Sequence, residues 1–415
     1  MAKPQYPPLS RNRNFLALLF GRGVSSLGDY FGNLALSWLV YTITGSAFDL
    51  AITWVVFMIP RALVRLFAGV YVDKWNKRRI MLATEATRAV LFGSIGAGNL
   101  LGYTPLAFIF AVAFSVGLLG ALFDLAGNTV VPFLVERSSL LRANSTFTAV
   151  FQADSIAGPA LAGITIALYG TAAALLADSL SFVVLVFALL LITVPSMPLG
   201  QMQHTWKRDF KEGFAYFKTR MDLVWMSILV MGSNFGLGAL WYVYALIFSD
   251  NVLRSGSFGY GMLGTFSAAG ILASVVYLAK IGRVQRRRMA ILTSLFGMGA
   301  AVMALSFTTT LPEALVAIFV FGLFLPFSDT IPTVYYQQTV PGPVLGRIFG
   351  FKQFVEFLTA PVSVVFGAFA ASYYGVTKGI LIAGMVVVGC GVIGVFARPL
   401  KNLIPLPEPQ QPSQV

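Results

Sequence analysis

Twelve long apolar stretches constrain this chain more than any other feature of its sequence. A membrane-spanning helix needs about 20 apolar residues. Hydrophobic residues make up 57% of the 415-residue chain and charged residues only 11%, far below the roughly 25% that soluble domains carry. The candidate spans are roughly 15–42, 48–71, 79–101, 105–131, 143–168, 171–195, 222–249, 257–280, 289–309, 312–339, 345–373 and 376–397. The sequence therefore predicts an all-α integral membrane protein with twelve transmembrane helices.

The net charge of +13 lies mostly in alternate short loops. Basic residues collect near the N-terminus and in every second loop, namely Lys3, Arg11, Arg13, Lys74, Lys77, Arg78, Arg79, Arg137, Arg142, Lys207, Arg208, Lys211, Lys218, Arg220, Lys280, Arg283, Arg286, Arg287 and Arg288. Cytoplasmic loops carry this excess of Lys and Arg. We therefore expect a multi-pass protein of the inner (plasma) membrane with both termini in the cytoplasm. The same placement argues against nucleic acid as a partner.

The longest polar stretch, Pro195–Met221, divides the chain in the middle. Within it Trp206, Phe210, Phe214 and Phe217 recur at helical spacing among basic residues. This pattern predicts an amphipathic helix on anionic lipid at the cytoplasmic face, with a partner-docking helix as the alternative. We expect an N-terminal half at 1–195, a linker at 196–221, a C-terminal half at 222–398 and a disordered tail at 399–415.

The second half of the sequence echoes the first. GLLGALFD ending at Asp124 matches GLFLPFSD ending at Asp329, an offset of 205 residues. Asp154 and Glu356 are offset by 202, and each is followed by a proline five residues later. Residues 28–31 and 233–235 form a third match. These repeats predict two pseudo-symmetric six-helix halves around a midplane site.

Residues 69–79, GVYVDKWNKRR, form a short basic loop between two expected spans. The pattern G-x-x-x-D-[RK]-x-x-[RK]-[RK] resembles the loop between the second and third spans of major facilitator superfamily transporters. The resemblance implies the major facilitator fold and a gating role for this loop, through Gly69, Asp73, Lys74 and Arg78. A latch of Asp73 onto Arg347 and the N-terminus of the eleventh helix would fit. Alternatively, the basic residues only fix the topology.

Gly158-Pro159-Ala160-Leu161-Ala162-Gly163 resembles the antiporter motif of facilitators that export drugs. Small residues allow close helix packing and proline bends a helix, so a purely structural role fits equally. Further motifs resemble the macrolide-efflux and enterobactin-exporter group, the third drug:proton antiporter family, over nearly the whole chain. They are NFLALLFGRGVSSLGDY and LVYTITGS near the start, then residues 59–61, 123–124, 178–182 and 211–216.

This resemblance implies a secondary active transporter that exports amphipathic drug-like compounds by proton-coupled antiport and alternating access. The fourth span lacks the arginine through which the first drug-antiporter family relays protons, so that relay cannot be transferred. A dedicated carrier of a siderophore, lysophospholipid or other metabolite, by uniport or symport, is the alternative. A non-transporting membrane receptor or scaffold is a more remote one. We expect no enzyme activity, because the chain has a single histidine and no Ser–His–Asp arrangement.

Ionisable side chains inside a membrane are costly and therefore candidates for function. Asp29 and Asp154 lie at mid-depth with no basic residue within one turn, and burial disfavours the charged form of an acid. We expect these two to carry the coupled proton, with Glu356 and Asp178 as further candidates. The pairs Glu85–Arg88 and Lys352–Glu356 have helical spacing and can neutralise each other.

The remaining site candidates would form a wide apolar and aromatic site. They are Phe31, Phe151, Gln152, Asn234, Phe235, Tyr242 and Gln353, with Arg61 as a group for an anionic substrate or as a structural counter-ion. Arg22 has the same two possible roles. A lone His204 and a lone Cys390 give no metal or disulfide spacing. We expect no cofactor and no bound metal, and a protein that works as a monomer.

Overall fold

The computed structural model describes residues 7–67, 76–192, 215–282 and 284–403, and within these ranges the chain is helical and contains no strand. The helices are α1 (Arg13–Thr44), α2 (Ala47–Phe67), α4 (Lys77–Leu100), α5 (Leu106–Val130), α6 (Leu140–Leu191), α8 (Met221–Ala239), α9 (Ala245–Asn251), α10 (Gly256–Ile281), α11 (Arg287–Ser306), α12 (Leu311–Thr339), α13 (Gly342–Tyr374) and α14 (Val376–Phe396). A π-helical turn, η4 (Leu240–Tyr244), joins α8 to α9. Short 3₁₀ turns, η1 (Leu9–Arg11), η2 (Val131–Phe133), η3 (Arg137–Ser139) and η5 (Arg398–Asn402), flank the bundle.

Nine helices of the described chain are long and apolar enough to cross a membrane, taking α8, η4 and α9 as one. One of them, α6, is two helices joined at Gly170, whose φ of 81° and ψ of 170° are not helical. The break lies where the sequence predicts the boundary between the fifth and sixth spans. With α1 and α13, which are 32 and 33 residues long, the described chain provides the segments for twelve spans. This confirms the expected all-helical membrane fold.

The internal repeat is visible in the backbone. Gly375, between α13 and α14, has φ 85° and ψ 154°, and Gly170 adopts nearly the same conformation between the two arms of α6. Only glycine reaches this region without strain. The two glycines are 205 residues apart, which is the offset that relates Asp124 to Asp329. Each half therefore turns between its last two helices in the same way.

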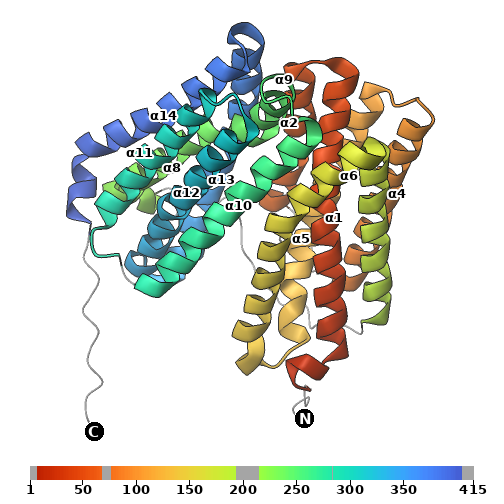
Figure 1. The fold of residues 1–415 in the computed structure, drawn as a ribbon. Helices are drawn as coiled ribbons and strands as arrows, with labels where there is room; N and C mark the ends of the chain where they lie inside the picture. The colour runs from red at the N-terminus through yellow and green to blue at the C-terminus, as the bar shows by residue number, and fades with distance from the viewer. Residues whose placement is uncertain (1–6, 68–75, 193–214, 283, 404–415) are drawn as a thin grey trace, which may run out of the picture.

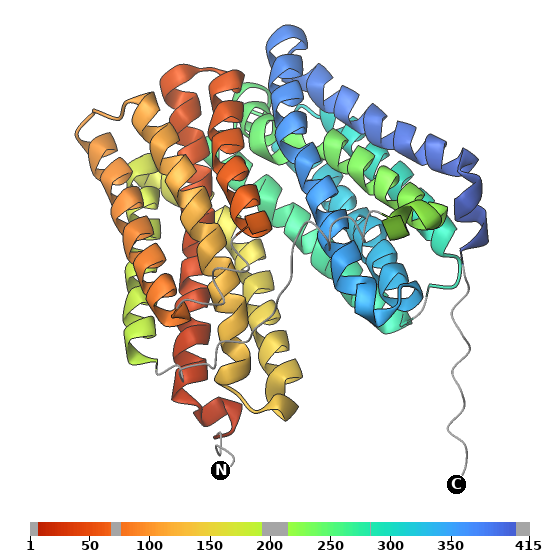
Figure 2. The same ribbon diagram turned by 180° about the vertical axis from the view of Figure 1, so that it is seen from behind.

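The helices form two bundles (Figure 1). One contains α1, α2, α4, α5 and α6, and the other contains α8 to α14. The bundles meet at the end near α9 and the start of α2, and they diverge toward the end where α1 begins and α14 ends. The view from behind shows the same arrangement (Figure 2). The molecule is thus closed at one end and splayed at the other.

Apolar side chains cover both the inside and the outside of these bundles. Between 28% and 56% of each candidate span is buried within the protein. Large apolar side chains such as Phe20, Val90 and Phe187, each more than 60% exposed, face outward from the helices. Helices with apolar outer faces are what a bilayer requires, because lipid offers no partner for polar groups.

The start of the chain is held by Asn12. Its side-chain oxygen accepts the N–H of Phe15 at 3.1 Å and so caps α1. Its side-chain nitrogen donates to the carbonyl of Leu134, after η2, at 2.7 Å. This buried side chain therefore ties the first helix to the loop before α6.

Residues 193–214, which include most of the expected linker, and the tail from 404 onward lie outside the described residues. Three members of the aromatic stripe predicted in the linker, Trp206, Phe210 and Phe214, are therefore not described. The fourth, Phe217, is 4% exposed. Its ring lies 6.1 Å from that of Tyr336 on α12. At this position the stripe packs against the protein instead of facing lipid.

Candidate functional site

A buried charge cluster joins α1 to α4. The guanidinium of Arg88 donates to Glu85, one turn away on α4, at 2.9 Å and to Asp29 of α1 at 2.5 Å. Ser25 of α1 donates weakly to Glu85 at 3.4 Å. Glu85 is fully buried, whereas the side chain of Asp29 is 41% exposed. The cluster therefore has one end inside the bundle and one end at the bundle surface.

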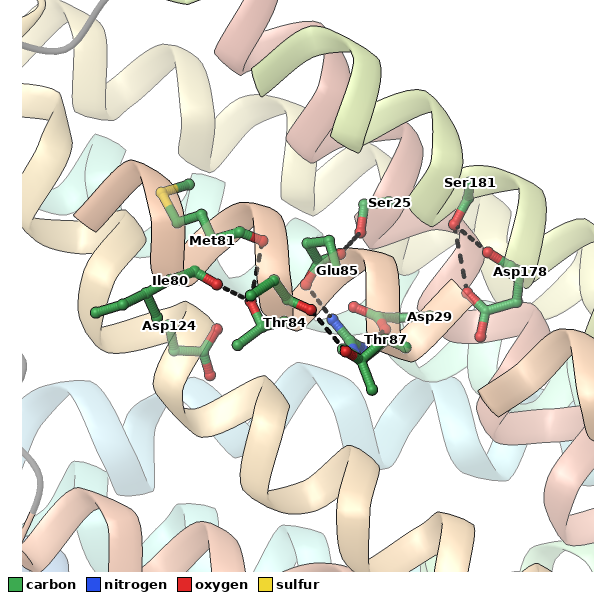
Figure 3. Close-up of polar contacts among 12 residues, drawn as sticks. Ser25, Asp29, Ile80, Met81, Thr84, Glu85, Thr87, Asp124, Asp178 and Ser181 are labelled. Carbon is green, nitrogen blue, oxygen red and sulfur yellow. Dashed lines mark hydrogen bonds and ion pairs between the residues drawn. The ribbon is translucent and has the colours of Figure 1, made fainter. Parts of the chain in front are cut away.

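Asp178 of α6 belongs to the same region, as Figure 3 shows for Asp29, Glu85 and Asp178. It interacts electrostatically with Asp29, Glu85 and Arg88. It is fully buried, and its Oδ2 has no hydrogen-bond partner. A Cβ placed on Gly32 of α1 would lie 1.9 Å from this oxygen. Glycine at position 32 is thus what lets the carboxyl group pack against the backbone of α1.

The Glu85–Arg88 pair confirms the pairing expected from helical spacing. The expectation that Asp29 lacks a basic neighbour is wrong in three dimensions, because Arg88 reaches it from another helix. The guanidinium carbon of Arg88 also lies 4.1 Å from the ring centre of Phe182 on α6. Sequence reasoning considered neighbours along one helix and missed this contact between helices.

A second ion pair links α2 to α5. Arg61 donates to Asp124 at 2.6 Å, and the two side chains are 29% and 34% exposed. Arg61 also lies over the ring of Phe57. It is therefore already neutralised, which supports its role as a structural counter-ion over a role in binding an anion.

Arg22 of α1 has a different environment. Its guanidinium lies 5.4 to 5.6 Å from the ring centres of Phe123, Phe147 and Phe151. Asp124 and Glu85 influence it electrostatically, but the described chain shows no hydrogen bond or ion pair to it. An arginine stacked among aromatic rings is stabilised by their electron-rich faces and keeps its donors available. Phe151, expected in the substrate site, is part of this group.

Asp154 lies on the first arm of α6, facing α1. The side chain of Ser26 on α1 lies close to the Asp154 carboxyl group, whose buried Oδ2 has no hydrogen-bond partner. Tyr30 of α1 packs beside it against Gly158, where an added Cβ would lie 2.5 Å from the tyrosine ring.

The glycine-proline motif of α6 contacts the second bundle. A Cβ on Gly261 of α10 would lie 2.2 Å from the carbonyl oxygen of Pro159, and one on Gly163 would lie 2.6 Å from the carbonyl of Ser257. The backbones of α6 and α10 touch because both carry glycine here. The motif therefore forms part of the closed end of the molecule.

A hydroxyl group from the second bundle enters α6 at the same place. Thr265 of α10 donates to the carbonyl of Ile156 at 2.7 Å and accepts the N–H of Ala160 at 3.1 Å. These two backbone groups are hydrogen-bond partners in an uninterrupted helix. Pro159, which has no N–H and bends a helix, stands next to them. Thr265 thus bridges two backbone groups of α6 beside Pro159, a contact between helices that the sequence analysis did not predict.

Two further contacts close the same end. The rings of Trp54 on α2 and Tyr242 on η4 are 4.8 Å apart, and Asn251 of α9 donates to the hydroxyl of Tyr41 on α1 at 2.9 Å. Tyr242 was expected in the substrate site, and the structure places it where the two bundles meet. A π-helical turn at this point widens the helix locally and is common at functional positions.

The other expected residues lie as follows. Phe31 is half-buried against the core, and Gln152 donates to Ser155 at 3.1 Å. Asn234 is exposed, and the ring of Phe235 lies 5.5 Å from that of Phe366. Arg78 donates to the carbonyls of Leu189 and Leu190 at the end of α6. Gly69, Asp73 and Lys74 lie outside the described residues. The backbone of Arg347, Gln353 and Glu356 is part of α13, but their side chains are not described.

The fold is that of known membrane transporters. The structure superposes on a nucleoside transporter with a TM-score of 0.74 over 93% of this chain and 100% of that one, at 13% sequence identity. It also superposes on a bacterial homologue of the iron transporter ferroportin, solved in an inward-facing state, with a TM-score of 0.69 over 91% of this chain and 98% of that one, at 17% identity. At such identities these similarities show the fold alone.

Sequence comparison adds the family. The chain is 22% identical to macrolide efflux protein A of Streptococcus pyogenes, over 94% of this chain and 97% of that protein. It is 24% identical to the multidrug efflux pump Tap of Mycolicibacterium fortuitum, over 94% and 96%, and to the staphyloferrin A transporter of Staphylococcus aureus, over 86% and 90%. Residues 4–405 match the family described as transmembrane secretion effector. The chain therefore belongs to this family of major facilitator transporters, within the macrolide-efflux group.

Proposed function

We propose that this membrane transporter is a proton-coupled exporter of amphipathic, drug-like compounds. The observation that carries the proposal is an excess of acidic over basic side chains within the helices of the first bundle. Away from helix ends, the described side chains of α1 to α6 include five acids (Asp29, Glu85, Asp124, Asp154, Asp178) and three arginines (Arg22, Arg61, Arg88). Two acids, Asp154 and Asp178, have no ion pair and an unpartnered Oδ2. An uncompensated carboxylate inside a membrane is costly, and taking up a proton removes that cost.

Asp154 and Asp29 are the acids we assign to coupling. Asp154 lies on α6 one turn before the motif that touches the second bundle, and Asp29 is the exposed end of the Arg88 cluster. One proton moving inward down 100 mV supplies about 2.3 kcal/mol. This free energy supports roughly a fifty-fold substrate gradient per proton.

We propose export as the direction of transport because two of the related proteins are efflux proteins. The bundles diverge at the end where α1 begins and α14 ends, and the excess of Lys and Arg in the loops on that side supports a cytoplasmic location for it. Substrate then enters from the cytoplasm or the inner leaflet. We propose that the protein acts as a monomer made of two halves, residues 1–195 and 222–398. Its basic loops would contact anionic lipid, and residues 69–78 would latch onto α13 during the transport cycle. The two related efflux proteins support a macrolide or another drug-like molecule as substrate.

The test is proton release on substrate addition to the purified protein, with macrolides, dyes and siderophores as ligands. We expect wild type to release protons and Asp154→Asn or Asp29→Asn to lose part or all of the release. Asp250→Asn is the matched control, because Asp250 lies in α9 at the opposite end of the helices. Substrate binding without proton release in wild type would refute antiport.

Arg22 supports a second candidate, a dedicated exporter of an anionic metabolite. The Arg22 guanidinium lies among three phenylalanine rings and keeps hydrogen-bond donors available, so it suits a ligand that has both a carboxylate and an apolar group. One relative is a siderophore transporter. Arg22→Gln separates the two candidates. If the substrate is anionic, this variant weakens its binding while that of neutral macrolides stays unchanged. Equal effects on both would remove this candidate.

A further inference from the structure

Two buried polar atoms without partners lie in the same charge cluster. The Nε of Arg88 lacks an acceptor, and the Oδ2 of Asp178 lacks a donor. Arg88 is 7% exposed and Asp178 is fully buried. Unpartnered buried polar atoms are rare and call for an explanation. Here a donor and an acceptor are both unpaired within one electrostatically coupled group.

The charges of the cluster do not balance. Facing Asp178 are Asp29 from α1, and Glu85 and Arg88 from α4. Arg22 of α1 adds a more distant positive charge that acts on Glu85. Three ionised carboxylates and one guanidinium would leave two net negative charges, and two of these carboxylates, Glu85 and Asp178, are fully buried. At least one proton is needed to reduce this cost.

Asp178 is the carboxyl group that the cluster leaves without compensation. The two terminal nitrogens of Arg88 are occupied by Glu85 and Asp29. The hydroxyl of Ser181 reaches Asp178 Oδ1 at 3.4 Å but lies nearer, at 2.7 Å, to the backbone carbonyl of Asp178. A neutral carboxylic acid suits this site, because it removes the charge.

We propose that Asp29, Arg88 and Asp178 form a proton-exchange site in which Arg88 changes partners. While Arg88 is paired with Asp29, the proton is stored on Asp178. When that proton moves to Asp29, Arg88 turns to the carboxylate of Asp178, and the neutral Asp29 at the solvent end releases the proton to water. The transfer from Asp178 to Asp29 conserves the proton. The release to water then removes one proton from the cluster, and the cycle closes when Asp29 takes up another proton and passes it to Asp178. As a step of coupled transport, the site rests on the proposed function and extends it by separating the storing acid from the exchanging acid.

Infrared spectroscopy of the full-length protein in lipid nanodiscs tests the site without any substrate. Wild type should show the C=O stretching band of a buried protonated carboxylic acid. Asp178→Asn should remove that band, and Asp250→Asn should leave it in place. Since asparagine has nearly the shape of the neutral acid, this variant should keep the fold, which a monodisperse elution profile verifies.

Asp29→Asn tests the change of partner. With Asp29 neutral, Arg88 should pair with Asp178, so the Asp178 band should disappear although that residue is unchanged. A merely structural proton on Asp178 would keep its band in this variant and would overturn the partner exchange. The absence of any band assignable to Asp178 in wild type would overturn the whole site.

Ser181→Ala supplies a second marker should Asp178→Asn not purify. Loss of the weak hydroxyl contact should shift the frequency of the Asp178 band, and an unmoved band would contradict its assignment. These outcomes are separate from those of the proton-release assay. A protein with the Asp178 band but without substrate-dependent release would keep this proton site and lose the proposed antiport.

Discussion

Replacing Thr265 by valine removes the hydroxyl bridge between the bundles while preserving side-chain shape. The hydroxyl makes two hydrogen bonds to α6, at 2.7 Å to the Ile156 carbonyl and at 3.1 Å from the Ala160 N–H. A hydrogen bond contributes about 1 kcal/mol net, so the bridge favours the closed end by at most about 2 kcal/mol. That corresponds to roughly thirty-fold in the equilibrium between closed and open. The true value is smaller to the extent that the two backbone groups pair with each other in the variant.

Electron paramagnetic resonance distances measure this equilibrium. Spin labels at Tyr103 and Phe307, both more than 70% exposed, report on the two bundles in a Cys390→Ser background. Both residues lie on the closed side, because Tyr103 follows α4 and Phe307 follows α11, and each of these helices begins on the side where the bundles diverge. Thr265→Val should increase the population at long distance.

Thr265→Ser is the matched control, because it keeps the hydroxyl and should resemble wild type. An unchanged distance distribution in Thr265→Val would refute the reasoning. So would an equal change in both variants, since a lost methyl contact and not the hydrogen bonds would then explain it.

Three further predictions follow from the contacts described. Gly261→Val places its Cβ against the carbonyl of Pro159 and should hold the closed end apart, seen as longer label distances and lost transport in a protein that still purifies. Arg88→Gln leaves the buried Glu85 without its cation and should cost about 3–5 kcal/mol, visible as a large fall in the thermal unfolding temperature that Glu85→Gln partly restores. Asn12→Ala removes a helix cap and should cost about 1–2 kcal/mol, measured the same way; no change would contradict its role in holding α1.

The sequence predicts those features of the fold that depend on neighbours along the chain. Apolar length identifies the spans, and the break near residue 170 appears as an interruption in hydropathy. The i, i+3 spacing predicts the ion pair between Glu85 and Arg88. Each of these needs only the geometry of a single helix.

Contacts between helices depend on rotation and crossing angle, which the sequence does not state directly. Asp29 and Arg88 are 59 residues apart, and no periodic pattern connects them. Thr265 looks like an ordinary polar residue in an apolar helix. Its importance arises only because Gly261 and Gly163 allow α10 to approach α6 closely enough for a hydroxyl to reach the backbone. The signal available in the sequence was the glycine content of both segments.

The proposed coupling of proton binding to conformation would act through the first arm of α6. Asp154 lies two residues before Ile156, whose carbonyl receives the hydroxyl of Thr265, and Pro159 and Gly163 follow on the face that touches α10. Asp178 lies on the second arm of α6, beyond the break at Gly170, and packs against the α1 residues that flank Asp29. A change in charge at Asp154 therefore acts directly on the arm that the other bundle contacts, whereas Asp178 is connected to that arm through α1 and the turn at Gly170. Because allostery requires an element that both sites bias, the bend at Pro159 is where we expect proton binding and closure to be coupled.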